Sequence, residues 1–449
     1  MRTIAKILLA SLLATTVGAC SLDVPDLNNP GIDGLENNPT PSAVAAACTG
    51  LLIGSRRNVA QGNGLILQLG VLGREAYDFD AADPRYVGEL IAGTLNPGSP
   101  FGGNFWAQPY ANLRNGNIVL GAVDKVADFT AADKAAIRGF TETIQALDLL
   151  EVMDTHDTNG AVIDTDLPID QLGAIVQKPM VLARIVSLLD DAKTQLATGG
   201  DAFPFALSAG YKGFDTPATF LTFNRAIRAR VAIYAGDFDG ALAALDESFL
   251  DDGAAADLDA GVYHTYGTSS GDTTNGLINP NIYAHPSLTA DAAKKADGNP
   301  DDRLTRKVTK ADKPGSAQGL SSDDAFTIYT SPSSPVPIIR NEELILLRAE
   351  AEIGKNDVAA AADDLNLIRT RSGGLAARAD LTAGNIVDEL LYNRRYSLMF
   401  EGHRWIDLRR FGKDLPLDMP TDIRNVRYPI PLNECNARTN EPACALGST

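Results

Sequence analysis

Apolar residues recur every three to four positions along most of the chain, which is the spacing of amphipathic helices. Residues 131–153 are the longest example, with Ile137, Phe140 and Ile144 on one face. The sequence Thr130-Ala-Ala-Asp133 in front of them is typical of an N-cap. Shorter stretches of the same kind predict helices at 65–74 and 105–123.

Two segments have the pattern of paired helices joined by a tight turn. In 220–249, an apolar helical face is followed by the turn Gly236-Asp-Phe-Asp239 and then by a second apolar face. A looser copy consists of a helix at 342–353, a turn at 354–357 and a helix at 358–370. Each unit resembles a tetratricopeptide repeat. Because long inserts separate the two units, a regular solenoid is not expected.

The segment 251–338 between these pairs is rich in Gly, Ser, Pro and Asp and contains scattered tyrosines. A run of this length without structure is uncommon inside a compact domain unless it has a function. We therefore expect a folded, loop-rich insert, with short strands around 326–329. Loops held on a rigid helical frame are common recognition surfaces.

The first twenty residues have the order of a secretory signal. Arg2 and Lys6 precede an apolar run at 7–17, which is too short to span a bilayer. Val17-Gly-Ala-Cys20 follows, and small residues before a cysteine resemble the bacterial lipobox. We expect a signal peptide over 1–19, a lipidated Cys20, and an extended tether over 20–41 because of its Pro, Asn and Gly content. The alternative is an ordinary signal peptide with a coincidental cysteine.

The overall charge excludes several classes of partner. The 449 residues carry a formal net charge of −18. Nucleic acid and anionic membrane surfaces both require clustered Lys and Arg, so neither is expected to bind this chain directly.

Three further cysteines follow Cys20. Cys48 lies in an apolar stretch and is expected to be a buried free thiol. Cys435 and Cys444 lie in a tail rich in Asn, Pro and Ala, where an exported chain favours a small disulfide loop. Metal binding is the alternative, but two cysteines without a nearby pair of histidines do not make a zinc site.

Residues 393–411, NRRYSLMFEGHRWIDLRRF, are the densest feature of the sequence. Apolar residues can bury one side, and Gly402 supplies a helix stop or a sharp bend. Glu401 and Asp407 have the helical spacing to pair with Arg404 and Arg410. The five arginines exceed the local acids, so distant carboxylates are expected to complete their pairing.

This segment resembles the near-terminal motif of the SusD/RagB family of nutrient-binding outer-membrane lipoproteins. Other parts of the chain also resemble family motifs in the family's order: Leu22–Pro25, Phe105-Trp106 with Tyr110, Leu347–Ala351, Asn366 to Gly373, and Tyr428–Pro431. Asn393 and Ser397 depart from the pattern, since the family usually has Glu at both positions.

The resemblance implies a mainly α protein with the SusD-like fold: tetratricopeptide-like helix pairs, and a loop-rich region with few short strands. We expect one domain over 42–449, with an N-terminal helical part at 42–250, the insert at 251–338 and a C-terminal helical part at 339–449. The resemblance implies a surface-exposed, lipid-anchored outer-membrane protein. It would capture an oligosaccharide or a peptide for a TonB-dependent, SusC-like transporter, without catalysis.

The motif residues are expected to be scaffold, so aromatic side chains elsewhere must hold the ligand. A sugar platform needs flat aromatic faces and polar groups for hydroxyls. The candidates are Tyr77, Arg85, Tyr86, Tyr263, Tyr266, Tyr283 and Tyr329.

Two other classes of function remain open, a surface glycoside hydrolase and a periplasmic tetratricopeptide-type adaptor. Catalytic features are weak: Gly267-Thr-Ser-Ser-Gly271 lacks the strand and helix of a nucleophile elbow. No cofactor or metal is expected. The polar turn at 154–159 lacks the spacing of a calcium-binding EF-hand, and the four histidines are scattered.

Overall fold

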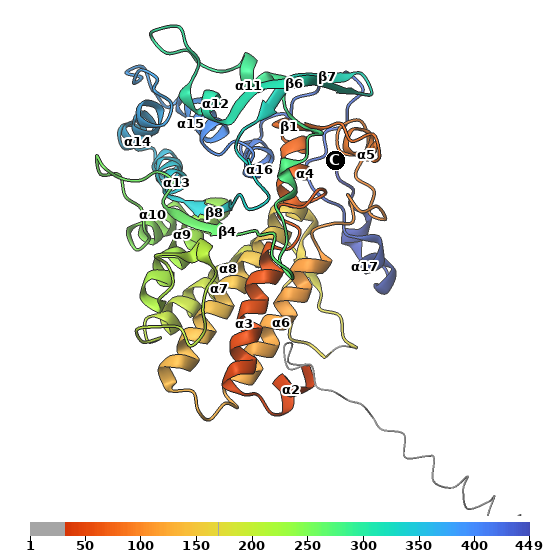
Figure 1. Cartoon of the computed structure of the whole chain (residues 1–449), viewed down its shortest axis with the longest axis vertical. Helices are drawn as coiled ribbons and strands as arrows, with labels where there is room; N and C mark the ends of the chain where they lie inside the picture. The colour runs from red at the N-terminus through yellow and green to blue at the C-terminus, as the bar shows by residue number, and fades with distance from the viewer. Residues whose placement is uncertain (1–31, 169) are drawn as a thin grey trace, which may run out of the picture.

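The computed structural model describes residues 32–168 and 170–449 (Figure 1). The predicted signal peptide, Cys20 and most of the tether lie outside the described residues. Within the tether, Ile32–Asn37 forms the short helix α2 instead of an extended segment. No helix among the described residues is long and apolar enough to cross a bilayer.

Helices dominate the structure, as predicted. The longer ones are α3 (Pro41–Arg56), α6 (Ala107–Val123), α7 (Ala131–His156), α8 (Lys178–Leu196), α9 (Pro217–Ala235), α10 (Phe238–Asp246), α13 (Asn341–Gly354), α14 (Val358–Arg371) and α15 (Ile386–Ser397). The short ones are α4 (Leu65–Leu72), α5 (Arg85–Gly88), α11 (Pro286–Ala290), α12 (Asp302–Lys307), α16 (Arg404–Arg410) and α17 (Leu432–Ala437).

The strands form four antiparallel pairs. These are β1 (Ala76–Asp78) with β5 (Ile282–Ala284), β2 (Ala161–Val162) with β3 (Ile175–Val176), β4 (Gly261–His264) with β8 (Val336–Arg340), and β6 (Val308–Ala317) with β7 (Leu320–Phe326). The strand expected around 326–329 lies earlier in the chain, because β7 ends at Phe326 and residues 327–329 are not in a strand. Five of the eight strands in the described part of the chain come from the segment after residue 260, so the insert is folded.

Helix α7 is the centre of the N-terminal helical frame and packs on α6 and α8. It begins with a capping box, in which Thr130 Oγ1 accepts from the Asp133 amide at 3.1 Å and the Asp133 carboxylate accepts from the Thr130 amide at 2.9 Å. Its face with Ile137, Phe140 and Ile144 is buried as predicted. A side chain at Gly139 would lie 2.6 Å from Cγ of Leu196, so glycine there permits the close approach of α8.

Both predicted helix pairs are present, as α9 with α10 and as α13 with α14. Gly236 ends α9 in the left-handed conformation (φ +73°), which glycine adopts at little cost. Asp237 Oδ1 then caps α10 by accepting from the Gly240 amide at 2.9 Å. In Figure 1, the frame of α3, α6, α7 and α8 lies at the end opposite the β6–β7 hairpin, and the two helix pairs lie along one side of the molecule.

The three cysteines in the described residues are in the states that the sequence predicts. Cys48 is a buried free thiol in the core between α3 and its neighbours, as predicted. Cys435 and Cys444 are joined by a disulfide, which closes a loop over α17. The tail beyond it lies against residues 425–427, where the Val426 amide donates to the Ser448 carbonyl at 2.8 Å.

We expect Leu347→Ala to lower the free energy of unfolding by about 2–5 kcal/mol, because the fully buried side chain would leave a cavity in the core. The matched control is Leu172→Ala, at a leucine that is 54% exposed, with an effect within about 0.5 kcal/mol. Urea denaturation followed by circular dichroism measures both values. Equal effects of the two substitutions would contradict the described core.

Candidate functional site

The segment 393–411 is a helix, a bend and a second helix. Helix α15 ends at Ser397, and α16 begins at Arg404. Gly402 lies between them at φ +89°, so the predicted bend is present. Trp405 is fully buried, and its indole N–H donates to the Asn425 carbonyl at 2.8 Å. This tryptophan therefore holds the C-terminal segment and offers no face to a ligand.

The acids of this segment bind arginines from several elements. Asp407 accepts from Arg394 at 2.7 Å and from Arg410 at 3.1 Å, which confirms the predicted Asp407–Arg410 pair. Arg410 also makes a two-pronged contact with Glu350 of α13, at 2.7 and 3.0 Å. The expected distant carboxylates thus complete the pairing.

The predicted Glu401–Arg404 pair is wrong. Glu401 instead accepts from Arg340, at the end of β8, at 3.0 Å. Helical spacing brings two residues together only when both lie on the same continuous helix. The bend at Gly402 separates Glu401 from α16, so its carboxylate faces a different element.

Asn393 and Ser397, the two departures from the family pattern, both contact a fully buried arginine. Arg303 Nη1 donates to Asn393 Oδ1 at 2.8 Å and to Ser397 Oγ at 3.1 Å. The charge of Arg303 is matched by Asp301, at 2.6 Å. Asp301 already supplies the carboxylate that a buried guanidinium needs. The neutral side chains of Asn393 and Ser397 are therefore sufficient to complete the hydrogen bonding of Arg303.

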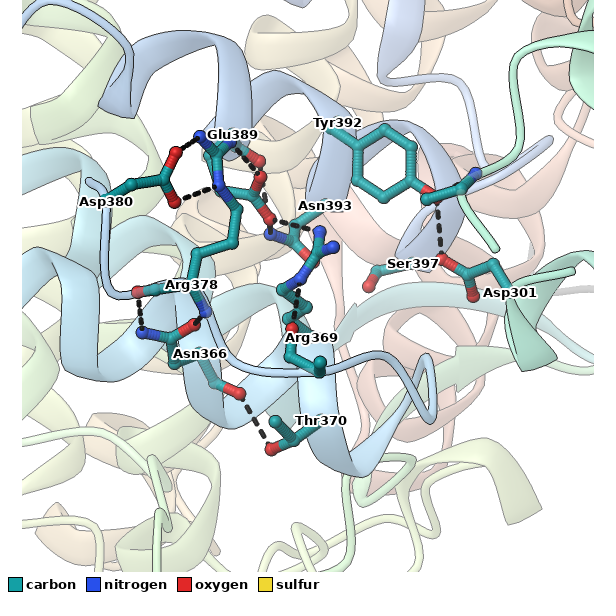
Figure 2. A network of polar contacts seen from close by, with 12 residues as sticks. Asp301, Asn366, Arg369, Thr370, Arg378, Asp380, Glu389, Tyr392, Asn393 and Ser397 are labelled. Atoms are coloured by element: carbon teal, nitrogen blue, oxygen red, sulfur yellow. Dashed lines mark hydrogen bonds and ion pairs between the residues drawn. The ribbon is translucent and has the colours of Figure 1, made fainter. Parts of the chain in front are cut away.

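A second polar network joins α14 to α15 (Figure 2). Glu389 accepts from Arg369 at 3.0 Å, from Arg378 at 2.9 Å and from the Asn393 amide group at 2.8 Å. Arg378 also binds Asp380, and the hydroxyl of Tyr392 donates to Asp301 at 2.9 Å. These residues hold helices together, and no open cavity is needed to explain their contacts.

Four of the seven candidate ligand residues are enclosed. Tyr77, Tyr86, Tyr266 and Tyr329 are 4–6% exposed. The Tyr77 hydroxyl donates to Asp418 at 2.9 Å, and the Tyr329 hydroxyl donates to the Phe400 carbonyl at 3.1 Å. The Tyr86 hydroxyl donates to the Gly62 carbonyl, and Arg56 lies over the ring of Tyr266. A ring this deeply buried presents no flat face to a sugar.

The other three candidates reach the surface at separate places. Arg85 forms an ion pair with Asp83 at 2.7 Å and lies over the ring of Phe101. Tyr263 in β4 is half-buried and donates to the Asp259 carbonyl. Tyr283 in β5 is half-buried beside the β6–β7 hairpin, and its hydroxyl donates to the Lys313 carbonyl at 3.3 Å.

Tyr283 lines a cleft of about 430 Å³, which we call the insert cleft. Its walls are the turn at 276–280, strand β5 and the β6–β7 hairpin, and Ile278, Asp312, Lys313 and Phe326 also line it. Gly315 lies directly against the Tyr283 ring, where any larger residue would displace the ring. The cleft combines aromatic and aliphatic surface with an amide, a carboxylate and an ammonium group.

Two of the predicted residues, Tyr283 and the enclosed Tyr329, line the insert cleft, whereas its other polar residues, Asn279, Asp312 and Lys313, were not predicted. The available signal was the sequence Asp312-Lys-Pro-Gly315 in a loop-rich segment. The turn at 276–280 and strand β5 are distant in sequence from it, so the cleft depends on tertiary packing that a local pattern does not encode.

The sequence model of the SusD family matches residues 266–442, which contain the insert cleft and the motif segment. This match agrees with the resemblance to the SusD/RagB family that the sequence motifs predict. No curated protein matches this chain.

Several solved structures share the SusD-like fold. A SusD-like carbohydrate-binding protein from Bacteroides fragilis has a TM-score of 0.70 at 15% identity, covering 90% of this chain and 99% of that one. A SusD superfamily protein from Bacteroides vulgatus has a TM-score of 0.67 at 15% identity, covering 91% and 98%. A laminarin-binding SusD-like protein has a TM-score of 0.66 at 18% identity, covering 88% and 97%.

The buried carboxylates around the motif predict a pH dependence of stability. Burial alone raises the pKa of Glu342, but the charges of Arg340 and Lys307 outweigh it and lower the pKa from 4.5 to about 2. A carboxyl with a lowered folded-state pKa stabilises the fold above its unfolded pKa. That stability is lost as the pH falls from about 4.5 toward 2.

We therefore expect Glu342→Gln to lower the free energy of unfolding by about 2–4 kcal/mol at pH 7 and by much less near pH 3. Urea denaturation at several pH values measures this difference. The matched control is Glu247→Gln, which breaks the exposed pair with Lys193 and should cost less than about 1 kcal/mol. A pH-independent effect of Glu342→Gln would contradict the proposed linkage.

Proposed function

We propose that this chain is a cell-surface lipoprotein that captures an oligosaccharide in the insert cleft and passes it to a TonB-dependent, SusC-like transporter. The observation that carries the proposal is the half-buried Tyr283 ring, which lines the insert cleft together with polar side chains. Two of the solved neighbours are described as binding carbohydrate or laminarin, which favours a sugar over a peptide.

The insert cleft has the chemistry that a sugar ring requires. The C–H face of a pyranose packs on aromatic or aliphatic surface, which Tyr283, Phe326 and Ile278 supply. Its hydroxyls need donors and acceptors, which Asn279, Asp312 and Lys313 supply. The Phe326 ring stacks on the buried ring of Phe400 at 4.3 Å between centroids, so the apolar wall is anchored to the core.

The helical frame and the sequence of the N-terminus support the rest of the proposal. The lipid on Cys20 would hold the protein at the membrane through the segment 20–41. The helix pairs α9–α10 and α13–α14 would form the rigid side that contacts the transporter, as the family resemblance implies. The β6–β7 hairpin lies at the end of the molecule away from the frame of α3, α6, α7 and α8, and it would stay free for ligand (Figure 1).

We expect Tyr283→Ala to weaken oligosaccharide binding about tenfold, because a sugar would lose its aromatic platform. Isothermal titration with a panel of oligosaccharides, including fragments of laminarin, measures the effect. The matched control is Tyr263→Ala, at a half-buried tyrosine outside the cleft, which should bind like the wild type. Equal affinities of the two variants would rule out the insert cleft as the site. If new reducing ends form while the protein is incubated with the oligosaccharides, the alternative function of a surface glycoside hydrolase would be favoured.

We expect Cys20→Ala to release the protein from the outer membrane, because the thiol that would carry the lipid is removed. Fractionation of cells, followed by an immunoblot, measures the distribution. The wild-type protein should remain with the membrane and should co-purify with a TonB-dependent barrel after mild detergent extraction. Unchanged membrane association of the variant would contradict lipid anchoring. Co-purification with other proteins and no barrel would favour the periplasmic adaptor.

A further inference from the structure

The arginines of the motif segment differ in their pairing. Arg394 and Arg410 bind Asp407, Arg395 binds Asp291 at 2.8 Å, and Arg409 donates to two backbone carbonyls. Among the residues that the structure describes, Arg404 has no hydrogen bond and no ion pair. An arginine without a partner is unexpected here, because the chain carries 57 acidic residues against 39 Lys and Arg.

The guanidinium group of Arg404 is open to solvent on one side. The side chain is half-buried, yet its nitrogen atoms are not sealed in the interior, unlike two nitrogens of Arg394. Arg404 lines a groove of about 470 Å³ between α15, α16 and the segment 413–414, which we call the Arg404 groove. Leu391, Leu408 and the ring of Tyr392 give this groove an apolar part.

The acids around the Arg404 groove are already compensated. Asp291 is bound to Arg395, and Asp388 is bound to Lys413 at 2.8 Å. Asp414 is almost fully exposed and lies 3.9 Å from Arg424. Lys413 is 44% exposed at the rim and has two further N–H donors. The lining thus has equal numbers of acidic and basic side chains, and Arg404 is the one among them without a partner in the described part of the chain.

Within residues 32–168 and 170–449, no carboxylate forms an ion pair with Arg404 in place of a ligand. Glu75 acts on Arg404 only at longer range, and it accepts from the Phe400 amide at 3.3 Å instead. Burial raises the pKa of Glu75 to about 7, so this carboxyl is partly neutral near physiological pH. Burial and the nearby charge of Arg395 lower the pKa of Arg404, and a bound anion would oppose both effects.

We propose that the Arg404 groove binds a small ligand through a carboxylate or sulfate group, held by the guanidinium fork of Arg404 with Lys413 at the rim. A planar guanidinium binds two oxygens of such a group at once, which a single ammonium cannot do. The apolar part of the groove would contact the body of the ligand. This site is separate from the insert cleft and does not rest on the function proposed there.

Titration of the mature protein with three probes tests the proposal. Methyl glucuronoside carries a carboxylate, glucose 6-sulfate carries a sulfate ester, and methyl glucoside is the neutral control. We expect at least one anionic probe to bind at least tenfold more tightly than the neutral one, and the stronger of the two identifies the acidic group. Its affinity should fall as NaCl is added, because the attraction is electrostatic.

Substitutions assign the binding to this groove. Arg404→Gln should weaken the anionic probe at least tenfold, and Arg404→Lys should weaken it less, because the charge remains and the fork is lost. Arg114→Gln, at an exposed arginine on α6, is the matched control and should bind like the wild type. If Arg404→Gln fails to fold, the comparison of Arg404→Lys with the wild type decides.

Three results would overturn the proposal: equal binding of charged and neutral probes, no binding of either anionic probe, or wild-type affinity in folded Arg404→Gln and Arg404→Lys. Tyr283→Ala separates the two sites. It should leave the anionic probe unaffected even if it abolishes binding of neutral oligosaccharides. Failure at one site is thereby distinguished from failure at the other.

Discussion

The need to pair buried guanidinium groups constrains the C-terminal half of the molecule. Arg230, Arg303, Arg340 and Arg394 are all nearly or fully buried, and each lies against a carboxylate. For Arg303 this is Asp301, two residues away, and for the other three it comes from another element. An unpaired charge in such a place would cost several kcal/mol. The pairs therefore define which elements are adjacent: α9 with α13, β8 with the bend before α16, and α15 with α16.

This pairing positions the variable part of the structure. Arg340 ends β8, the strand by which the insert returns to the helical frame, and it is bound to Glu342 and Glu401. Arg303 stands in α12, just before β6, and is fixed to Asp301 and to α15. Buried ion pairs thus hold the base of the β6–β7 hairpin. The described ion pairs do not include the hairpin residues that line the insert cleft, such as Asp312 and Lys313.

The helical frame could be predicted from sequence because its information is local. Spacing of apolar residues, the Thr130 cap and the glycine turns each act within a few residues, and the corresponding helices are present. The burial of tyrosines could not be predicted in this way. Tyr77 is enclosed by His285 and Asp418, and Tyr329 by the segment before Gly402, and both contacts join distant parts of the chain.

The ion pairs of the segment 393–411 also show that local spacing is not enough to predict a contact. The spacing of Glu401 and Arg404 predicts a pair only if the helix is continuous, and the left-handed Gly402 interrupts it. The interruption has two consequences. The carboxylate of Glu401 pairs with Arg340 and so joins β8 to the motif segment. Arg404, at the edge of a groove, is left without a carboxylate partner among the described residues. One backbone conformation thus completes the buried network and creates the open charge, so the scaffold motif and the proposed anion site have a common structural origin.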